Sequence, residues 1–300
     1  MKQLFFKGIV LSALVLFLSN CKKDYAGGYT APPAPAPAPS GPDINLASSG
    51  TLGQYLTNNK GQALYMFADE ADGANACTGD CAAIWPEFTT DLTTAKLNAG
   101  LNIADFDTIT TTTGKKQVTY KGWPLHTFSP PSTGGYGGSS NVPEGAGTTD
   151  GDGFAGLWFA AKPDYTIMLA NKQLRGLDGN IYKSDFTIGA GNTIYFTNGD
   201  GRTIYTFSLD SFNINKFTKA DLSNNNVFPI YEQNQVVVPS VLDKTLFGNI
   251  TVAGKQQMTY KGWPLHFFGQ DSVRGLTLAV SVPVAGKWPV AVKDIADPRR

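Results

Sequence analysis

Four stretches of this chain share one pattern of hydrophobic and polar positions. Each begins with a short run rich in β-branched and aromatic residues, passes through a turn, and ends in a second run that reads Gly-x-x-(Leu/Ile)-(Tyr/His)-x-Phe. Such runs, joined by residues that tolerate a positive φ, are typical of β-hairpins. The sequence therefore predicts four related hairpins. The first runs are Gln54–Thr57, Gln117–Tyr120, Thr193–Thr197 and Gln257–Tyr260, and the second runs are Gly61–Phe67, Gly122–Phe128, Gly201–Phe207 and Gly262–Phe268.

The hairpins form two pairs because the chain contains an internal duplication with an offset of 140 residues. Lys115–Phe128 and Lys255–Phe268 are identical at eleven of fourteen positions, which marks a repeat. Both histidines of the chain, His126 and His266, occupy one equivalent position. We expect an all-β fold of two tandem hairpin-based modules. Closure of the four hairpins into one barrel- or propeller-like body is the alternative.

The second run of each hairpin predicts an aromatic core. Alternation along a strand places its Tyr or His on the same face as the following Phe. Because tyrosine and histidine exchange at this place, we expect a ring with a hydrogen-bonding tip. In three hairpins a carboxylate follows five residues later, which we interpret as closing a turn. The pairs are Tyr65 with Phe67, His126 with Phe128, Tyr205 with Phe207 and His266 with Phe268; the carboxylates are Glu70, Asp210 and Asp271, with Pro131 in the remaining hairpin; Trp123 and Trp263 precede the histidines.

Two further elements are expected around the hairpins. One closing strand should complete each module, near Gly156–Ala161 in the first and near Gly275–Val280 in the second. A short helical turn should surround Cys81–Trp85.

Composition agrees with an exported all-β protein. Charged residues make up 16% of the chain and aromatic residues 12%, and glycine and proline are abundant. The formal net charge is zero, and there is no cluster of Lys and Arg of the kind that neutralises phosphates. We therefore expect no nucleic-acid partner.

The N-terminal segment has the features of a bacterial lipoprotein signal. Lys2 and Lys7 flank the start of an apolar run, Gly8–Leu18, that is too short to span a bilayer. The run ends in Leu-Ser-Asn-Cys, which predicts Cys21 as the lipidated residue. Lys22 after the cysteine favours sorting to the outer membrane. An ordinary secretory signal with an incidental cysteine is the alternative.

An Ala/Pro-rich segment, Ala26–Pro42, follows the cysteine. Alternating Ala-Pro favours an extended polyproline-II rod that rises about 3.1 Å per residue, so the tether could hold the modules up to roughly 50 Å from the lipid. We therefore divide the chain into a signal peptide (1–20), a lipidated cysteine with its tether (21–45), a first module (46–176) and a second module (177–300). The expected location is the cell envelope, with the membrane as a partner.

The remaining cysteines lie in Cys77-Thr-Gly-Asp-Cys-Ala-Ala-Ile-Trp85-Pro. With the Tyr-x-Phe motif upstream and the Gln117–Phe128 block, this segment resembles the bacterial secreted repeat proteins with a Y-x4-D motif, predicted lipoproteins of unknown function. In that family a Tyr-x-aromatic-x-x-Asp motif precedes Cys-x-Gly-x-Cys and Trp-Pro. Here Glu70 replaces the Asp, and His126 stands where the family has Tyr. The resemblance implies architecture and location, and it implies no reaction.

In an exported protein a disulfide between Cys77 and Cys81 is the simplest expectation. Metal ligation and redox activity are the alternatives. A Cys-x3-Cys pair with a distant histidine, such as His126, is a ligand set that copper accepts. Against copper, His266 has no cysteines in its own half. No other cofactor is predicted.

The chain has no Gly-x-Ser-x-Gly, His-Glu-x-x-His or Walker-type motif. A hydrolase built on Asp69 and Glu70 is disfavoured because neighbours on a strand point to opposite faces. We predict a non-enzymatic, lipid-anchored envelope protein whose modules bind or present an unidentified protein or small molecule. The alternative is electron transfer or copper binding through Cys77, Cys81 and His126.

Overall fold

The computed structural model describes residues 41–131 and 141–299. The predicted signal peptide, Cys21 and nearly all of the tether lie outside these residues. Within the two described ranges, no helix is both long enough and apolar enough to cross a membrane.

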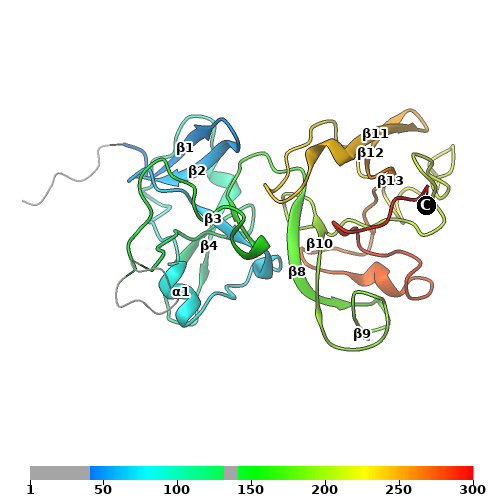
Figure 1. The fold of residues 1–300 in the computed structure, drawn as a ribbon, viewed down its shortest axis with the longest axis horizontal. Coiled ribbons are helices and arrows are strands. Elements are labelled where there is room, and N and C mark those ends of the chain that lie inside the picture. The colour runs from blue at the N-terminus through cyan, green and yellow to red at the C-terminus, as the bar shows by residue number, and fades with distance from the viewer. Residues whose placement is uncertain (1–40, 132–140, 300) are drawn as a thin grey trace, which may run out of the picture. The chain divides into compact units, whose positions relative to one another are not determined.

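The fold is all-β, as predicted. The described residues form thirteen strands in five small antiparallel sheets, and none of these sheets closes into a barrel (Figure 1). The first module contains β1 (Ile44–Ser49), β2 (Gly53–Asn58), β3 (Tyr65–Phe67), the short helix α1 (Asp80–Ile84), β4 (Phe106–Thr110), β5 (Lys116–Tyr120), β6 (Trp123–Pro124) and β7 (Trp158–Ala160). The second contains β8 (Met168–Arg175), β9 (Ile181–Tyr182), β10 (Asn192–Thr197), β11 (Phe247–Val252), β12 (Lys255–Tyr260) and β13 (Trp263–Pro264). Single 3-10 turns cover Ala68–Glu70, Ile103–Asp105, Phe154–Gly156, Lys244–Leu246 and Leu278–Ser281.

The duplication is visible in the sheets. The order β4-β5-β6 in the first module recurs as β11-β12-β13 in the second. Tyr120 lies opposite Trp123 in one sheet and Tyr260 opposite Trp263 in the other. The two residues between each such pair, Lys-Gly, both have a positive φ. This turn geometry matches the right-handed twist of the strands that it joins, which explains why the Tyr-Lys-Gly-Trp sequence is kept in both modules. Because β8 pairs with β10 and β9, we describe it with the second module; the predicted module boundaries themselves stay a prediction.

Within each module the two hairpins meet at their equivalent positions. Tyr65 and His126 lie opposite each other and exchange both backbone hydrogen bonds, at 2.9 and 3.0 Å. Tyr205 and His266 do the same at 2.8 and 2.9 Å. The residues that the sequence places at one position of the repeat therefore form a direct cross-strand pair.

The closing strand was predicted correctly in one module and wrongly in the other. In the first, β7 pairs with β3, inside the predicted Gly156–Ala161. In the second, the predicted segment Gly275–Val280 enters a 3-10 turn, and Leu278 N donates to the Asp271 side chain. Closure comes instead from residues 287–291, where Ala291 N donates to Ile204 O at 2.8 Å. The missed signal is a second Gly-x-Trp motif, residues 286–288.

A stack of four aromatic rings forms the centre of each module. In the first module the successive ring centroids lie 4.1, 3.9 and 4.4 Å apart, and in the second 4.5, 3.5 and 4.8 Å. The aromatic core predicted from the repeat is thus confirmed, and four of its members, Trp85, Trp158, Phe228 and Trp288, come from outside the predicted hairpins. The order of rings is Phe67, Trp158, Trp85, Phe128 in the first stack and Phe207, Trp288, Phe228, Phe268 in the second.

One arginine links the second module to the first. Arg274 donates to Ala71 O at 2.7 Å and to Lys121 O at 2.9 Å, and its guanidinium lies 4.8 Å from the centre of the Trp123 ring. The Trp123 indole in turn donates to Gly199 O at 2.8 Å. Burial lowers the pKa of Arg274 to about 10, so the side chain stays charged at neutral pH. A Cβ on Gly122 would overlap the Arg274 guanidinium, so a larger residue there would displace it from these contacts.

Candidate functional site

The tyrosine and histidine tips predicted from the repeat meet carboxylates in the core, and each carboxylate comes from the other hairpin of the module. Glu70, after the first hairpin, lies 2.9 Å from His126 Nε2 of the second. Asp271, after the fourth hairpin, accepts a 2.6 Å hydrogen bond from the Tyr205 hydroxyl of the third. Asp210 faces His266 at 3.7 Å. The second oxygen of each of these carboxylates accepts from a backbone N–H six or seven residues later in the chain. One oxygen therefore closes a turn, as predicted, and the other faces the ring of the neighbouring hairpin.

Glu144 completes the set where the repeat has Pro131. The Tyr65 hydroxyl lies 2.9 and 2.7 Å from the two Glu144 oxygens, and Asp150 N also donates to this carboxylate. Burial raises the pKa of Glu144 above its ordinary value. The sequence did not single out Glu144, because it lies in the long loop after the second hairpin and not at the repeat spacing.

The contacts of His126 require one shared proton. Its Nδ1 lies 3.0 Å from Trp85 O, and a carbonyl only accepts, so Nδ1 carries a hydrogen. Two bare acceptors would repel at the 2.9 Å between Nε2 and Glu70 Oε2, so a proton lies between them. The pair is then a neutral acid with neutral imidazole, or a carboxylate with imidazolium. In both cases its net charge is zero, which suits two side chains with no solvent exposure.

Two amides extend this network in each module. Gln117 Nε2 donates to Leu125 O and approaches His126 Nε2, and Gln117 Oε1 accepts from Asn75 at 2.7 Å. Gln257 and Asn215 repeat this arrangement at 2.8 Å beside His266. The sequence interpretation missed these amides, although both pairs are separated by the offset of 140 and could have been found by it.

The second network is looser than the first. Asp210 is one methylene shorter than Glu70, and its Oδ2 stays 3.7 Å from His266 Nε2. Asp210 Oδ2 and His266 Nδ1 are both buried without a hydrogen-bond partner among the described residues. Phe217, at the position equivalent to Cys77, packs its ring edge-on against Phe207 and Trp288. An aromatic ring thus occupies the place that the disulfide has in the first module.

The cysteines form the expected disulfide. Cys77 and Cys81 are joined by an S–S bond of 1.99 Å, and Cys81 lies in the α1 helix that the sequence predicted. Neither sulfur is a free thiolate, and the thiolate is the form that binds copper. Among the residues that the structure describes, no group of three or more His, Cys, Asp and Glu side chains is arranged to hold a metal ion. The buried rings therefore build the core, and an accessible site must be sought on the surface.

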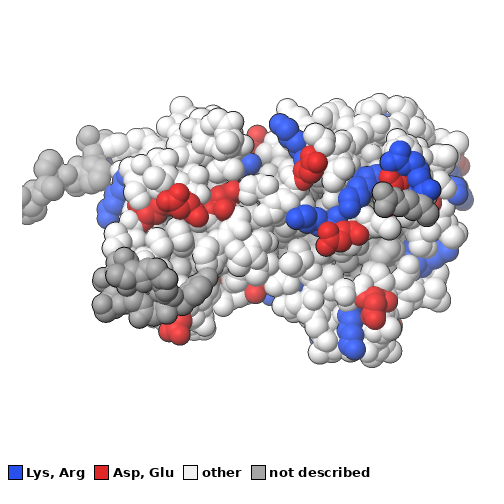
Figure 2. Space-filling model, viewed as in Figure 1, with Lys and Arg blue, Asp and Glu red and all other residues white. Residues whose placement is uncertain are grey.

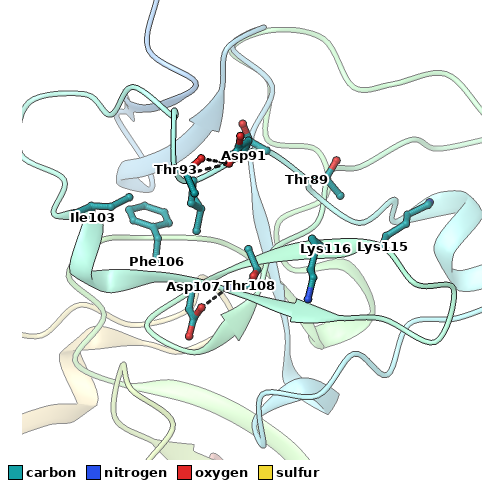
Figure 3. Close-up of a pocket in the computed structure, with 11 residues that line it drawn as sticks. Thr89, Asp91, Thr93, Ile103, Phe106, Asp107, Thr108, Lys115 and Lys116 are labelled. Atoms are coloured by element: carbon teal, nitrogen blue, oxygen red, sulfur yellow. Dashed lines mark hydrogen bonds between the residues drawn. The ribbon is translucent and has the colours of Figure 1, made fainter.

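A surface groove of about 850 Å³ lies over the β4–β5 hairpin (Figure 3). The loop 89–93 lies on one side of the groove, and the strands β4 and β5 lie on the other. Ile103 lies beside the Phe106 ring at one end, and Lys115 lies at the opposite end, where its Nζ is 2.9 Å from Glu87. No feature of the sequence singled out this groove. Its lining residues are Thr89, Thr90, Asp91, Leu92, Thr93, Ile103, Phe106, Asp107, Thr108, Lys115 and Lys116.

The second module has a smaller groove, of about 290 Å³, at the equivalent place. It lies at the turn of the β11–β12 hairpin and is lined by Glu232, Gln233, Asn234, Gly254, Lys255 and Gln256. Lys255, the repeat partner of Lys115, again forms an ion pair, here with Glu232 at 2.6 Å. The two modules therefore share a groove with a lysine–carboxylate pair at one end.

Comparison with known proteins gives one match. Residues 47–89 match the model of a family described as a secreted repeat of unknown function. The matched segment contains β2, β3, the disulfide and Trp85. No curated protein and no solved structure matches the chain. The match indicates an extracellular or envelope location.

The buried carboxylate of Asp271 predicts a dependence of stability on pH. Burial raises its pKa to about 6, whereas an unfolded aspartate titrates near about 3.9. The stabilising contribution of the protonated form is therefore complete below about pH 4 and is lost as the pH rises through 6. A difference of about two pKa units corresponds to about 3 kcal/mol. Asp271→Asn should remove this part of the pH dependence, as measured by chemical denaturation between pH 4 and pH 8. An unchanged slope in the variant would contradict the assignment.

The two histidines should differ in their contribution to stability. His126→Ala leaves Glu70 buried without its partner, so we expect a loss of about 3–5 kcal/mol in the free energy of unfolding. His266→Ala is the matched control, because Asp210 is already beyond hydrogen-bond distance. Its loss should be near about 2 kcal/mol, set mainly by the cavity. Urea denaturation of both variants measures the difference, and equal losses would show that the Glu70 contact adds nothing.

Proposed function

Because the chain contains a secreted repeat of the family matched above, we propose that it is an envelope protein held by a lipid on Cys21, and that its two modules bind a ligand without chemical conversion. The observation that carries the proposal is the groove that recurs at the β-hairpin of both modules. The duplication allows the two modules to be compared with each other, and a lysine–carboxylate pair lies at the groove in both.

The position of the titratable core residues supports binding over catalysis. The side chains of His126, Glu70, His266 and Asp210 have no solvent exposure, and a general acid or base must come within hydrogen-bond reach of its substrate. Glu70 and His126 instead hydrogen-bond to each other across the two hairpins of the first module, and Asp210 faces His266 in the second. The threonines and lysines of the first groove, by contrast, lie at the surface.

The anchor rests on sequence features that lie outside the described residues. The apolar run ends at Leu-Ser-Asn-Cys21, and the described fold begins only after the Ala/Pro-rich tether. A lipid followed by an extended tether would keep both grooves away from the bilayer surface. Lys22 supports an outer-membrane position.

Cys21→Ala tests the anchor. The variant should leave the membrane fraction and appear as a soluble or uncleaved precursor form, because the only proposed lipid attachment is lost. Fractionation of the envelope, combined with the mass of the isolated protein, measures this. A variant that stays with the outer membrane at the mature mass of the wild type would overturn the lipoprotein assignment.

A change in the first groove tests the binding role. Residues 43–300, labelled with a fluorophore, should sediment with isolated envelopes of the producing bacterium. Ile103 is half exposed in the groove, so Ile103→Ser should weaken retention about fivefold, the effect of about 1 kcal/mol of lost apolar contact. Ile188→Ser changes an isoleucine outside both grooves that is even more exposed, at 68%, and should leave retention unchanged. Equal retention of the two variants would exclude the groove as the binding site.

A further inference from the structure

We propose that both grooves bind an uncharged, hydroxyl-rich polymer, that is, a strand of neutral polysaccharide. This inference rests on the binding role proposed above and names the chemistry of the ligand. Charge, hydrogen-bonding groups, apolar surface and the duplication each contribute to it.

The charges of the grooves are balanced and already engaged. The first groove contains two carboxylates and two ammonium groups, and the second contains one of each. Neither lining therefore attracts a polyanion or a polycation. Three of these groups contact other lining residues: Asp91 accepts from Thr93, Asp107 accepts from Thr108 N, and Lys255 pairs with Glu232. The other two contact residues beside the first groove: Lys115 pairs with Glu87, and Lys116 donates to Thr110.

The wider surface agrees with an uncharged ligand. On the face shown in Figure 2, basic and acidic side chains lie in small groups separated by broad uncharged areas. A surface that binds a charged polymer presents instead a continuous stretch of one sign. The formal net charge of zero points in the same direction.

The polar groups of the grooves suit alcohols. Four threonines line the first groove, and each hydroxyl both donates and accepts a hydrogen bond. In the second groove three side-chain amides have the same double capacity. Sugar hydroxyls also donate and accept, so they can satisfy such groups in either direction. The residues concerned are Thr89, Thr90, Thr93 and Thr108 in the first groove and Gln233, Asn234 and Gln256 in the second.

The first groove also offers an apolar surface for the C–H face of a sugar ring. Ile103 is 50% exposed and lies beside the Phe106 ring (Figure 3). Leu92 lines the same groove. A ligand with one apolar face and a rim of hydroxyls would cover these side chains and meet the threonines at the same time.

The duplication favours a repeating ligand. Two sites of the same kind on one chain give a large gain in apparent affinity only when both can engage one molecule. A polymer with a repeating unit meets this condition, whereas a small monomer gains nothing from the second site. We therefore expect long strands to bind more tightly than short oligosaccharides of the same composition.

Competition in the envelope-retention assay tests the inference. Polysaccharide released from the envelopes is separated by ion exchange into an uncharged flow-through and a bound, charged fraction. The flow-through should compete with the envelopes for residues 43–300, and it should lose this effect after periodate, which cleaves vicinal diols. Protease treatment of the envelopes should leave retention unchanged. Retention should also change less than about twofold between low and high salt, since screening acts on charged contacts.

Three outcomes would overturn the inference. Competition by the charged fraction alone would assign a charged polymer, loss of retention after protease would assign a protein, and failure of the flow-through to compete would exclude neutral polysaccharide. In each of these cases a difference between Ile103→Ser and Ile188→Ser would still support the grooves as binding sites. Equal behaviour of these two variants would instead reject the proposed binding function itself.

Discussion

The rest of the fold depends on one kind of contact, in which a buried carboxylate from one hairpin meets a histidine or tyrosine from the other hairpin of the module. A buried carboxylate without a partner is strongly destabilising. Here Glu70 of one hairpin needs His126 of the next, and Asp271 of the last needs Tyr205 of the one before. No hairpin can therefore satisfy its own buried polar groups. This explains why the hairpins occur in pairs, and why Tyr65 and His126 form a direct backbone pair at the centre of the module.

The two modules stabilise the same ring stack in different ways. The first uses a disulfide, a hydrogen-bonded Glu–His pair and an indole at Trp85. The second replaces the disulfide by Phe217 and the indole by Phe228, and it leaves Asp210 and His266 farther apart. More aromatic contact thus compensates for a weaker polar network. The four-ring stack is common to both, with a phenylalanine in place of the indole at one of its four positions.

Much of the fold follows from local sequence pattern, and the remainder depends on contacts between distant residues. Alternation predicted the hairpins, and the repeat predicted Phe67, Phe128, Phe207 and Phe268 as core. Glu144 could not be found in this way, because a long loop brings it to Tyr65 and no periodicity constrains its position. The closing strand at 287–291 was missed because the connection before it differs in length between the modules. The grooves were missed because exposed polar residues carry no periodic signal, and only the folded hairpin brings them together.

The contact of Arg274 between the modules is asymmetric, because the second module supplies the arginine and the first supplies the tryptophan. The Arg274 side chain reaches from the second module to Trp123 of the first. The equivalent residue of the first module is Ala146. This follows from the next residue in each module, because Gly147 N donates to Gly61 O and Gly275 N to Gly201 O, and these two acceptors are related by the offset of 140. At the other side, Trp263 donates to Ala296 O, so the acceptor that a following module would supply is provided by the chain itself. The joint has two parts, an arginine of one module and a tryptophan of the module before it. Within the described residues, these two parts meet once, at Arg274 and Trp123. Addition of a third module by the same contact would require an arginine at position 146 or the release of Trp263.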